Sequence, residues 1–249
     1  MTTILVTGGT GTLGRLVTER LRADGHEVRV LSRHSESYAV DLRAGGPALD
    51  RAVAGVDTIV HCATTQTGGD RKAATHLITA ARRAGVSHLV YISIVGVDRI
   101  PLGYYKSKLA VEHLIEDSGI PWTILRATQF HDLLVQLFEK LAKLPVLLVP
   151  SGVQDQPIEV SEVADRMAEL ATREPAGRVQ DMGGPETRSF EDFAREYVRA
   201  TGRKRRVMGV PLFGETYGAF RKGHHLTPEH AVGKGPFGDF LNSRSDKRL

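Results

Sequence analysis

Cysteine and long apolar runs are scarce in this chain, and each shortage excludes a class of protein. Cys62 is the only cysteine among the 249 residues, so no internal disulfide can form, as is typical of a reducing compartment. No run of about 18 consecutive apolar residues occurs, the length that a membrane-spanning helix needs. The first strand-like run begins within a few residues of Met1, so we expect no signal peptide. We therefore expect a cytoplasmic protein with no membrane partner.

A strong excess of one charge is missing as well. The chain has 33 basic and 29 acidic residues, a net charge of +4 that is spread along its length. The one dense basic cluster, residues 203–206, lies between a predicted helix and an apolar run, so a solvated loop is a better interpretation than a phosphate site. The cluster has no interleaved aromatic residues and matches no DNA-binding motif. We expect no nucleic-acid partner.

Metal-ligand spacing is also lacking. His224, His225 and His230 are close in sequence, but no cysteine accompanies them and their spacing matches no metal site that we can defend. We predict no bound metal. The chain has no internal repeat and no low-complexity tract, so its length fits one large domain or a nucleotide-binding core with a smaller second part.

The most informative feature that is present is a run of glycines near the N-terminus. Residues 4–6 read as a buried strand and residues 15–22 as an amphipathic helix, with glycines three apart between them. The absent side chains allow a tight turn, close backbone approach to a pyrophosphate and close packing of the helix on the strand. The free N–H groups of such a turn, aided by the helix dipole, bind phosphates. We therefore predict a dinucleotide site, with an unliganded glycine turn as the alternative, formed by Gly8, Thr10, Gly11, Thr12, Leu13 and Gly14.

Strand-like and helical segments alternate along the first 142 residues. Strand-like runs occur at 4–6, 27–31, 58–61, 88–92 and 122–125, and helical periodicity occurs at 15–22, 71–84, 105–117 and 132–142. Strands separated by helices pair in parallel through right-handed crossovers. We expect an α/β fold with a doubly wound, mostly parallel sheet, helices on both faces and ligands at the carboxyl ends of the strands.

The pattern changes after residue 150. We expect a dinucleotide-binding core at 1–150 and a smaller substrate-covering part at 151–249 that is interleaved with the core. In this second part Ser189 is followed three residues later by an acid, which predicts the start of a helix that Gly202 ends.

The end of the second strand indicates which dinucleotide binds. Proteins that bind NAD have an acidic residue there, about 20 residues past the glycines, for the ribose 2′-hydroxyl. This chain has Ser32 and Arg33 instead, a hydroxyl and a guanidinium that suit a 2′-phosphate. We predict NADP(H) in preference to NAD(H), the alternative being that Arg33 only solvates a loop. Asp41 and Leu42 follow a third short strand and either border the adenine or belong to a plain loop.

A tyrosine and a lysine at helical spacing form a candidate catalytic pair. Tyr104 and Lys108 are four residues apart and share a helix face, whereas Tyr105 and Lys106 are rotated away by roughly 100° and 200°. At an effective dielectric of about 20, a lysine ~4 Å away favours a phenolate by about 4 kcal/mol, which would lower the phenol pKa from ~10 toward ~7. Such a phenol protonates a carbonyl oxygen while hydride arrives from a nicotinamide, and Ser93 would hold that oxygen. A chance pairing at this spacing is the alternative.

Together these motifs resemble the atypical short-chain dehydrogenase/reductases, and among them the NmrA-like NAD(P)H-binding proteins. The resemblance extends over nearly the whole chain and implies a Rossmann fold. Residues 7–14 resemble the phosphate loop of the family and residues 104–112 its active-site helix, and both motifs are specific. Residues 122–130, residues 157–164 and the last 25 residues agree with the family pattern.

The resemblance also implies roles for individual residues. Cys62, Ala63 and Thr64 lie where the family passes the ribose of the cofactor. Lys108 would contact the nicotinamide ribose, with Tyr104 as proton donor and Ser93 as its partner. The chain departs from the family at residues 94–96, which lack the second serine or threonine that catalytic members frequently carry.

Three functional hypotheses follow from these residues. The first, which we favour, is an NADPH-dependent oxidoreductase that reduces a small carbonyl or quinone-like substrate. Gln129, Phe130 and His131 follow the strand at 122–125 and either face that substrate or pack as an ordinary loop. The second is an NADP(H)-binding redox sensor that acts through a protein partner without turnover. The third is an epimerase or dehydratase that reuses its bound cofactor.

Overall fold

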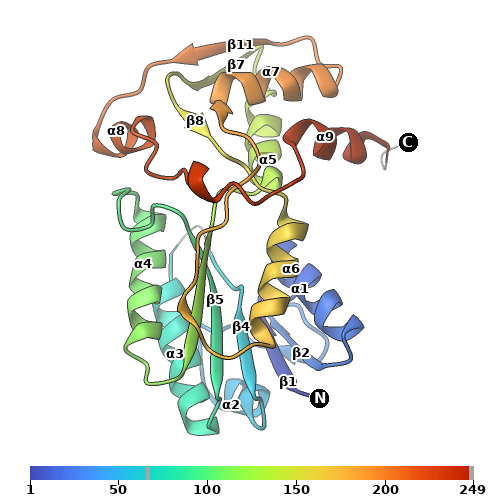
Figure 1. The fold of residues 1–249 in the computed structure, drawn as a ribbon, viewed down its shortest axis with the longest axis vertical. Coiled ribbons are helices and arrows are strands. Elements are labelled where there is room, and N and C mark those ends of the chain that lie inside the picture. The colour runs from blue at the N-terminus through green and yellow to red at the C-terminus, as the bar shows by residue number, and fades with distance from the viewer. Residues whose placement is uncertain (66–67, 247–249) are drawn as a thin grey trace. The chain divides into compact units, whose positions relative to one another are not determined.

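The computed structural model describes residues 1–65 and 68–246 and divides the chain into two compact units (Figure 1). Unit 1 comprises residues 1–93, 103–126 and 161–180, and unit 2 comprises residues 94–102, 127–160 and 181–249. Within the described residues, no helix has both the length and the apolar character needed to cross a membrane.

Unit 1 is built on a sheet of seven strands. These strands are β1 (Thr3–Thr7), β2 (Glu27–Ser32), β3 (Tyr38–Ala39), β4 (Thr58–His61), β5 (His88–Ile94), β6 (Trp122–Ala127) and β9 (Gly177–Arg178). Their order in the sheet is β3-β2-β1-β4-β5-β6-β9. β1 pairs in parallel with both β2 and β4, and the pairs β2–β3, β4–β5 and β6–β9 are parallel too. Because the order runs outward from β1 in one direction and from β4 in the other, the switch point where ligands bind lies between these two strands.

Helices cover both faces of this sheet (Figure 1). The helices of unit 1 are α1 (Thr12–Ala23), α2 (Pro47–Val53), α3 (Asp70–Ala84), α4 (Gly103–Glu116) and α6 (Val160–Ala171). The central strands read as continuous apolar runs because both faces are covered, and Ile4, Leu5 and Val6 of β1 are fully buried. Arg20 of α1 pairs with Asp165 of α6, which joins these two helices. The predicted doubly wound α/β fold is confirmed.

Unit 2 is the smaller C-terminal part, and aromatic residues form much of its core. Phe138, Phe193, Tyr197 and Phe237 are each at most 1% exposed and belong to one cluster. β7 pairs in parallel with β11, and β8 pairs antiparallel with β10. Its elements are α5 (His131–Leu141), β7 (Val146–Pro150), β8 (Gln154–Asp155), β10 (Arg188–Ser189), α7 (Phe190–Ala200), β11 (Arg206–Val210), α8 (Glu215–Arg221), a 3-10 helix (Pro228–His230) and α9 (Phe237–Asp246).

The expected boundary at residue 150 has to be corrected. After this residue the chain returns to unit 1, where α6 packs beside α1 and β9 extends the sheet next to β6. Before it, α5 and β7 already belong to unit 2, because their apolar side chains pack in the aromatic cluster with α7. The predicted cap of α7 is confirmed: the Ser189 hydroxyl accepts a hydrogen bond from the Asp192 N–H at 3.1 Å.

Candidate functional site

The glycine turn joins β1 to α1 at the switch point of the sheet. Gly8 has a left-handed backbone (φ +67°), and a Cβ there would lie 2.8 Å from the backbone of Ala63. A Cβ on Gly14 would collide with the Gly8 carbonyl oxygen, so the helix can start this close to the strand only with glycine at that position. Leu13 and Gly14 are buried, whereas Thr10, Gly11 and Thr12 are exposed.

The N-terminus of α1 is open to an anion. Gly11 is its N-cap and provides no side-chain hydrogen bond, and the first turn of α1 contains no acidic residue. The first N–H groups of a helix have no partner within the helix, and the dipole favours negative charge there. The turn therefore fits the diphosphate of a dinucleotide, as the sequence predicts.

Arg33 follows β2 and its side chain is exposed. Within residues 1–65 and 68–246, this guanidinium makes neither a hydrogen bond nor an ion pair, so it is available to a phosphate. The Ser32 hydroxyl accepts a hydrogen bond from the His34 N–H at 3.1 Å. Ser32 and Arg33 are therefore accessible to a 2′-phosphate, as the prediction of NADP(H) requires.

Asp41 and Leu42 follow β3. Arg43 donates hydrogen bonds to the Asp41 carboxylate, with Nη2 to Oδ2 at 2.8 Å, and this lowers the Asp41 pKa to about 2. The charge of Arg33 lowers it further, which indicates that Arg33 lies near this ion pair. Leu42 is buried in the core of unit 1. A contact of these residues with the adenine stays a prediction.

Cys62, Ala63 and Thr64 continue the chain beyond β4, beside the glycine turn. The Cys62 N–H donates to the Thr7 carbonyl at 3.1 Å, and the Ala63 N–H donates to the Thr7 hydroxyl at 3.3 Å. Burial raises the pKa of the Cys62 thiol to about 12, so this thiol stays protonated at physiological pH. The segment thus lines the switch point through its backbone and not through a reactive thiol.

Asp70 is a site residue that the sequence reasoning missed. It begins α3, and its carboxylate accepts hydrogen bonds from the Thr64 hydroxyl at 2.6 Å and from the Thr65 N–H at 2.8 Å. The Thr64 hydroxyl oxygen also lies 3.3 Å from the Tyr104 hydroxyl. Because Thr64 gives its proton to Asp70, the phenol of Tyr104 must be the donor in this second contact. An acid at the start of a helix, after Gly68 and Gly69, was the available signal.

The expected effect of Lys108 on Tyr104 has to be corrected. Lys108 is buried and donates from Nζ to the Ile92 carbonyl at 3.0 Å, with its ammonium 4.8 Å from the ring centre of Tyr91. Burial raises the pKa of Tyr104 above its ordinary value, and the charge of Asp70 raises it further. Burial also lowers the pKa of Lys108 to about 8. The phenol is therefore neutral at physiological pH, and it is not pulled toward the phenolate.

Ser93 lies near the carboxyl end of β5 and is 2% exposed. Its hydroxyl oxygen has no hydrogen-bond partner within the described part of the chain, so it is not bonded to Tyr104. A buried hydroxyl without a partner costs roughly 1–3 kcal/mol, which makes it a candidate to bind an oxygen of a ligand.

The three residues expected on the substrate side differ in their positions, and all three lie in unit 2. Gln129 lines an apolar pocket of that unit. Phe130 is the N-cap of α5 and is not among the lining residues. The prediction that His131 faces the substrate has to be corrected, because this side chain is fully buried. Its Nε2 is hydrogen-bonded to the Gly235 carbonyl at 2.9 Å, and its ring packs against Phe237. Its role is in the core of unit 2.

Comparison with known proteins gives a family and a relative. A family profile described as NAD(P)H-binding matches residues 8–174. The (4-alkanoyl-5-oxo-2,5-dihydrofuran-3-yl)methyl phosphate reductase of Streptomyces griseus is 32% identical over 230 residues, which cover 86% of this chain and 77% of that protein. The region that the family profile matches contains the glycine turn and the helix that carries Tyr104 and Lys108.

Two solved structures are similar over nearly the whole chain. An NADPH-dependent quinone oxidoreductase from Escherichia coli, solved with NADPH, has a TM-score of 0.81 and 18% identity, and the match covers 97% of this chain and 99% of that one. A nucleoside-diphosphate-sugar epimerase from Staphylococcus aureus has a TM-score of 0.77 and 17% identity, with 96% and 99% covered. At these identities the similarity shows the fold alone. Because the two proteins are named for different reactions, only the side chains at the site of this chain can indicate which kind of reaction it supports.

Proposed function

Since this chain belongs to the NAD(P)H-binding family of atypical short-chain dehydrogenase/reductases, we propose that it is an NADPH-dependent oxidoreductase that reduces a small carbonyl or quinone-like substrate. One observation carries the proposal. The Tyr104 hydroxyl is held as a neutral donor by Thr64 and Asp70, next to the strand ends where the cofactor binds. A neutral hydroxyl in that place suits protonation of a substrate oxygen.

The residues that would hold the cofactor follow from the geometry of unit 1. The N–H groups at the start of α1 would hold the diphosphate, since those of Gly8 and Gly11 are bonded to Leu31 and Gly8 carbonyls, and Arg33 would pair with a 2′-phosphate. We infer a preference for NADPH from that guanidinium. A bound nicotinamide supplies hydride to the carbonyl carbon of the substrate.

Tyr104 completes the reduction with a proton. As the carbonyl carbon of a ketone gains hydride, its oxygen becomes an alkoxide, and the proton moves from the Tyr104 oxygen to this oxygen. A quinone would take up one hydride and one proton overall and become a hydroquinone. The alkoxide of a ketone is a far stronger base than a phenolate, so for a ketone the transfer is favourable even though burial raises the pKa of Tyr104. The phenolate then regains a proton from water. The unpaired Ser93 hydroxyl would hold the same substrate oxygen.

Removal of the Tyr104 hydroxyl tests the proposal directly. Tyr104→Phe is expected to lower kcat for NADPH-dependent reduction of a quinone at least ~100-fold, because general acid catalysis contributes roughly 10²–10⁴-fold. Tyr105→Phe removes the neighbouring hydroxyl, which belongs to a buried side chain rotated away on the same helix, and should keep kcat within a factor of a few. NADPH binding, followed by fluorescence, should survive in both variants. Full activity of Tyr104→Phe, or loss of activity in Tyr105→Phe alone, would overturn the assignment.

One observation favours a second function, an NADP(H)-binding redox sensor. The pKa of Tyr104 is raised, and Lys108 donates to the Ile92 carbonyl, so the phenol is not activated in the way that the spacing predicted. In a sensor, both residues would only position the ribose. Binding of NADPH without its oxidation by any carbonyl or quinone would select this function.

A further inference from the structure

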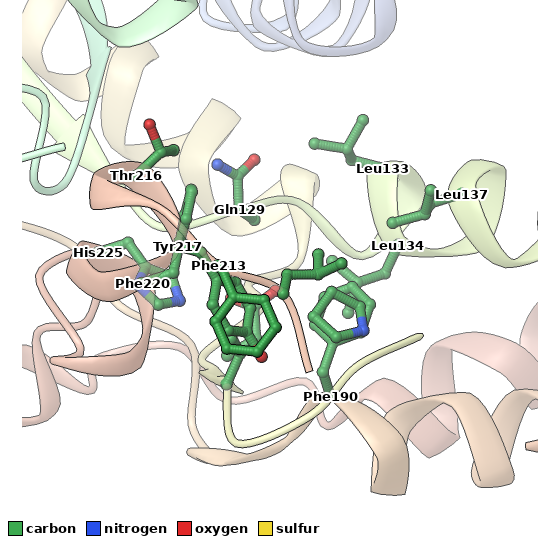
Figure 2. A pocket seen from close by; sticks show the side chains of 14 residues that line it. Gln129, Leu133, Leu134, Leu137, Phe190, Phe213, Thr216, Tyr217, Phe220 and His225 are labelled. Atoms are coloured by element: carbon green, nitrogen blue, oxygen red, sulfur yellow. The ribbon is translucent and has the colours of Figure 1, made fainter. Parts of the chain in front are cut away.

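Unit 2 contains a pocket of about 520 Å³ (Figure 2). This volume lies in the range of roughly 300–1,000 Å³ that is usual for small-molecule sites. Its fourteen lining residues come from positions 129 to 225 and belong entirely to unit 2. The pocket is therefore a property of one compact unit.

Two kinds of apolar side chain form most of the walls. α5 contributes Leu133, Leu134 and Leu137, which lie together in Figure 2. The segment that contains α8 contributes aromatic rings, among them Phe213 and Tyr217. Aliphatic and aromatic walls of this kind recognise a ligand by shape and by burial of apolar surface.

Three polar side chains of the lining are bonded to the protein itself. The Tyr217 hydroxyl donates to the Ser151 carbonyl. His225 donates from Nε2 to the Gln154 carbonyl at 2.8 Å, and Asp155 accepts from the Gln156 N–H at 2.8 Å. These contacts use part of the polar capacity of the lining, and the buried Nδ1 of His225, which has no partner among the described residues, remains as an acceptor.

The lining also offers no cation. None of the fourteen residues is lysine or arginine. Burial lowers the pKa of His225 to about 4 and raises the pKa of Asp155 to about 7, so the imidazole is neutral at physiological pH and the carboxyl carries little charge below pH 7. A phosphate or sulfonate would lose its hydration here and find no partner.

The rim of the pocket exposes apolar surface. Phe213 is 89% exposed and the preceding Leu212 is 46% exposed, although both side chains line the pocket. Large apolar groups gathered at the mouth of a concave site mark a surface that a ligand covers.

We propose that this pocket binds an uncharged, predominantly apolar organic molecule and rejects anionic ones. The inference rests on the proposed function in one respect: we take the bound molecule to be the carbonyl or quinone that is reduced. It separates this chain from proteins that act on a phosphate ester or a nucleoside-diphosphate sugar, since both ligands need cationic partners that this lining lacks. The substrate would be a hydrophobic ketone or quinone without an acidic group.

A matched pair of fluorescent probes tests the preference for neutral ligands without any cofactor. N-phenyl-1-naphthylamine is uncharged, and 8-anilinonaphthalene-1-sulfonate has the same ring skeleton with a sulfonate. Titrated into NADPH-free protein, the neutral probe should bind with a stoichiometry of one and at least ~tenfold more tightly than the anion. Equal or tighter binding of the sulfonate would overturn the proposal, as would failure of the neutral probe to bind.

A pair of leucine variants tests the location. Leu137 lines the pocket and is 39% exposed, whereas Leu144 does not line it and is 50% exposed. Leu137→Asp adds a charge to the wall without disturbing a buried position. It should weaken binding of the neutral probe at least ~tenfold. Leu144→Asp should leave the affinity unchanged. Similar effects of the two variants, or no effect of Leu137→Asp, would place the probe elsewhere and overturn the assignment.

Turnover separates this inference from the proposed function. With NADPH present, Leu137→Asp should raise KM for 2-methyl-1,4-naphthoquinone and leave the affinity for NADPH unchanged, whereas Leu144→Asp should change neither. Probe binding that depends on Leu137, without NADPH oxidation, would reject the reductase and keep the apolar site. NADPH oxidation with an unchanged KM in Leu137→Asp would show that the reduced substrate does not bind in this pocket and would keep the reductase.

Discussion

The partner of a buried polar group decides what that group can do, and Tyr104 illustrates this at the scale of single residues. Helical spacing correctly indicates that Tyr104 and Lys108 share a face of α4. It does not indicate which atom the long lysine side chain reaches, and here the ammonium donates to the Ile92 carbonyl of β5. The phenol instead contacts Thr64, which is bonded to Asp70. The sequence therefore predicted the residues but not the protonation chemistry.

Arg33 is expected to determine the preference between the two dinucleotides. Its exposed guanidinium would pair with a 2′-phosphate, and a hydrogen bond to a charged group contributes roughly 1.5–3 kcal/mol, or about 10–100-fold in affinity. Arg33→Ala should lower the affinity for NADPH by about this factor and leave the affinity for NADH within about twofold of wild type, as measured by calorimetry. Arg51→Ala, which removes an exposed arginine of α2, serves as the control. Equal weakening of both nucleotides by Arg33→Ala would reject the assignment.

Asp155 should make the stability of the protein depend on pH. Burial raises its pKa from 3.8 to about 7, so between these values the unfolded chain has lost the proton and the folded chain has kept it. The free energy of unfolding therefore falls as pH rises through this window and levels off above about 7. Asp155→Asn keeps an oxygen that can accept from the Gln156 N–H and removes the ionisation. Relative to wild type, it should gain roughly 3 kcal/mol of stability between pH 4.5 and pH 7, at about 1.36 kcal/mol per pH unit.

Urea unfolding of both proteins at several pH values measures this difference. Parallel stability curves for wild type and Asp155→Asn would show that the Asp155 carboxyl ionises alike in the folded and unfolded chains. Its neutral state in the folded protein would then have to be abandoned.

At the scale of elements, the turn between β1 and α1 is where we propose that the cofactor binds. A side chain on Gly14 would meet the Gly8 carbonyl oxygen, so Gly14→Ala must push α1 away from the strand end. We expect a loss of roughly 1–3 kcal/mol in stability, as is usual for overpacking, and loss of NADPH binding. Gly218→Ala is the matched control, because a Cβ there meets nothing within 4 Å. NADPH affinity of Gly14→Ala equal to wild type would show that the turn does not hold the diphosphate.

Elements marked by an apolar run or a cap could be predicted from the sequence, and short helices could not. β4 was predicted with its observed bounds, and the cap at Ser189 marked the start of α7, because apolar runs and capping depend on nearby residues. α2 and α8 have only seven residues each, too few for a periodic pattern to stand out. Tertiary packing, which local sequence does not record, stabilises such short helices.

At the scale of the whole molecule, the chain crosses between units 1 and 2 several times, and this hid both the boundary and the pocket. The sequence predicts one boundary at residue 150 and a second part interleaved with the core, but not where the chain crosses: β9 returns to unit 1 to pair with β6. The pocket in unit 2 combines side chains from Gln129 to His225, and only the first of them was suspected from the sequence. A site assembled from separate segments has no local motif, whereas the glycine turn lies within seven consecutive residues.

The absorbance of NADPH at 340 nm tests the central claim most directly. Wild-type protein should oxidise NADPH in the presence of at least one member of a panel of uncharged ketones, aldehydes and quinones, with a rate that saturates in the carbonyl compound and falls at least ~100-fold in Tyr104→Phe. Binding of NADPH with no oxidation by any member of the panel would contradict the account and identify the protein as a sensor.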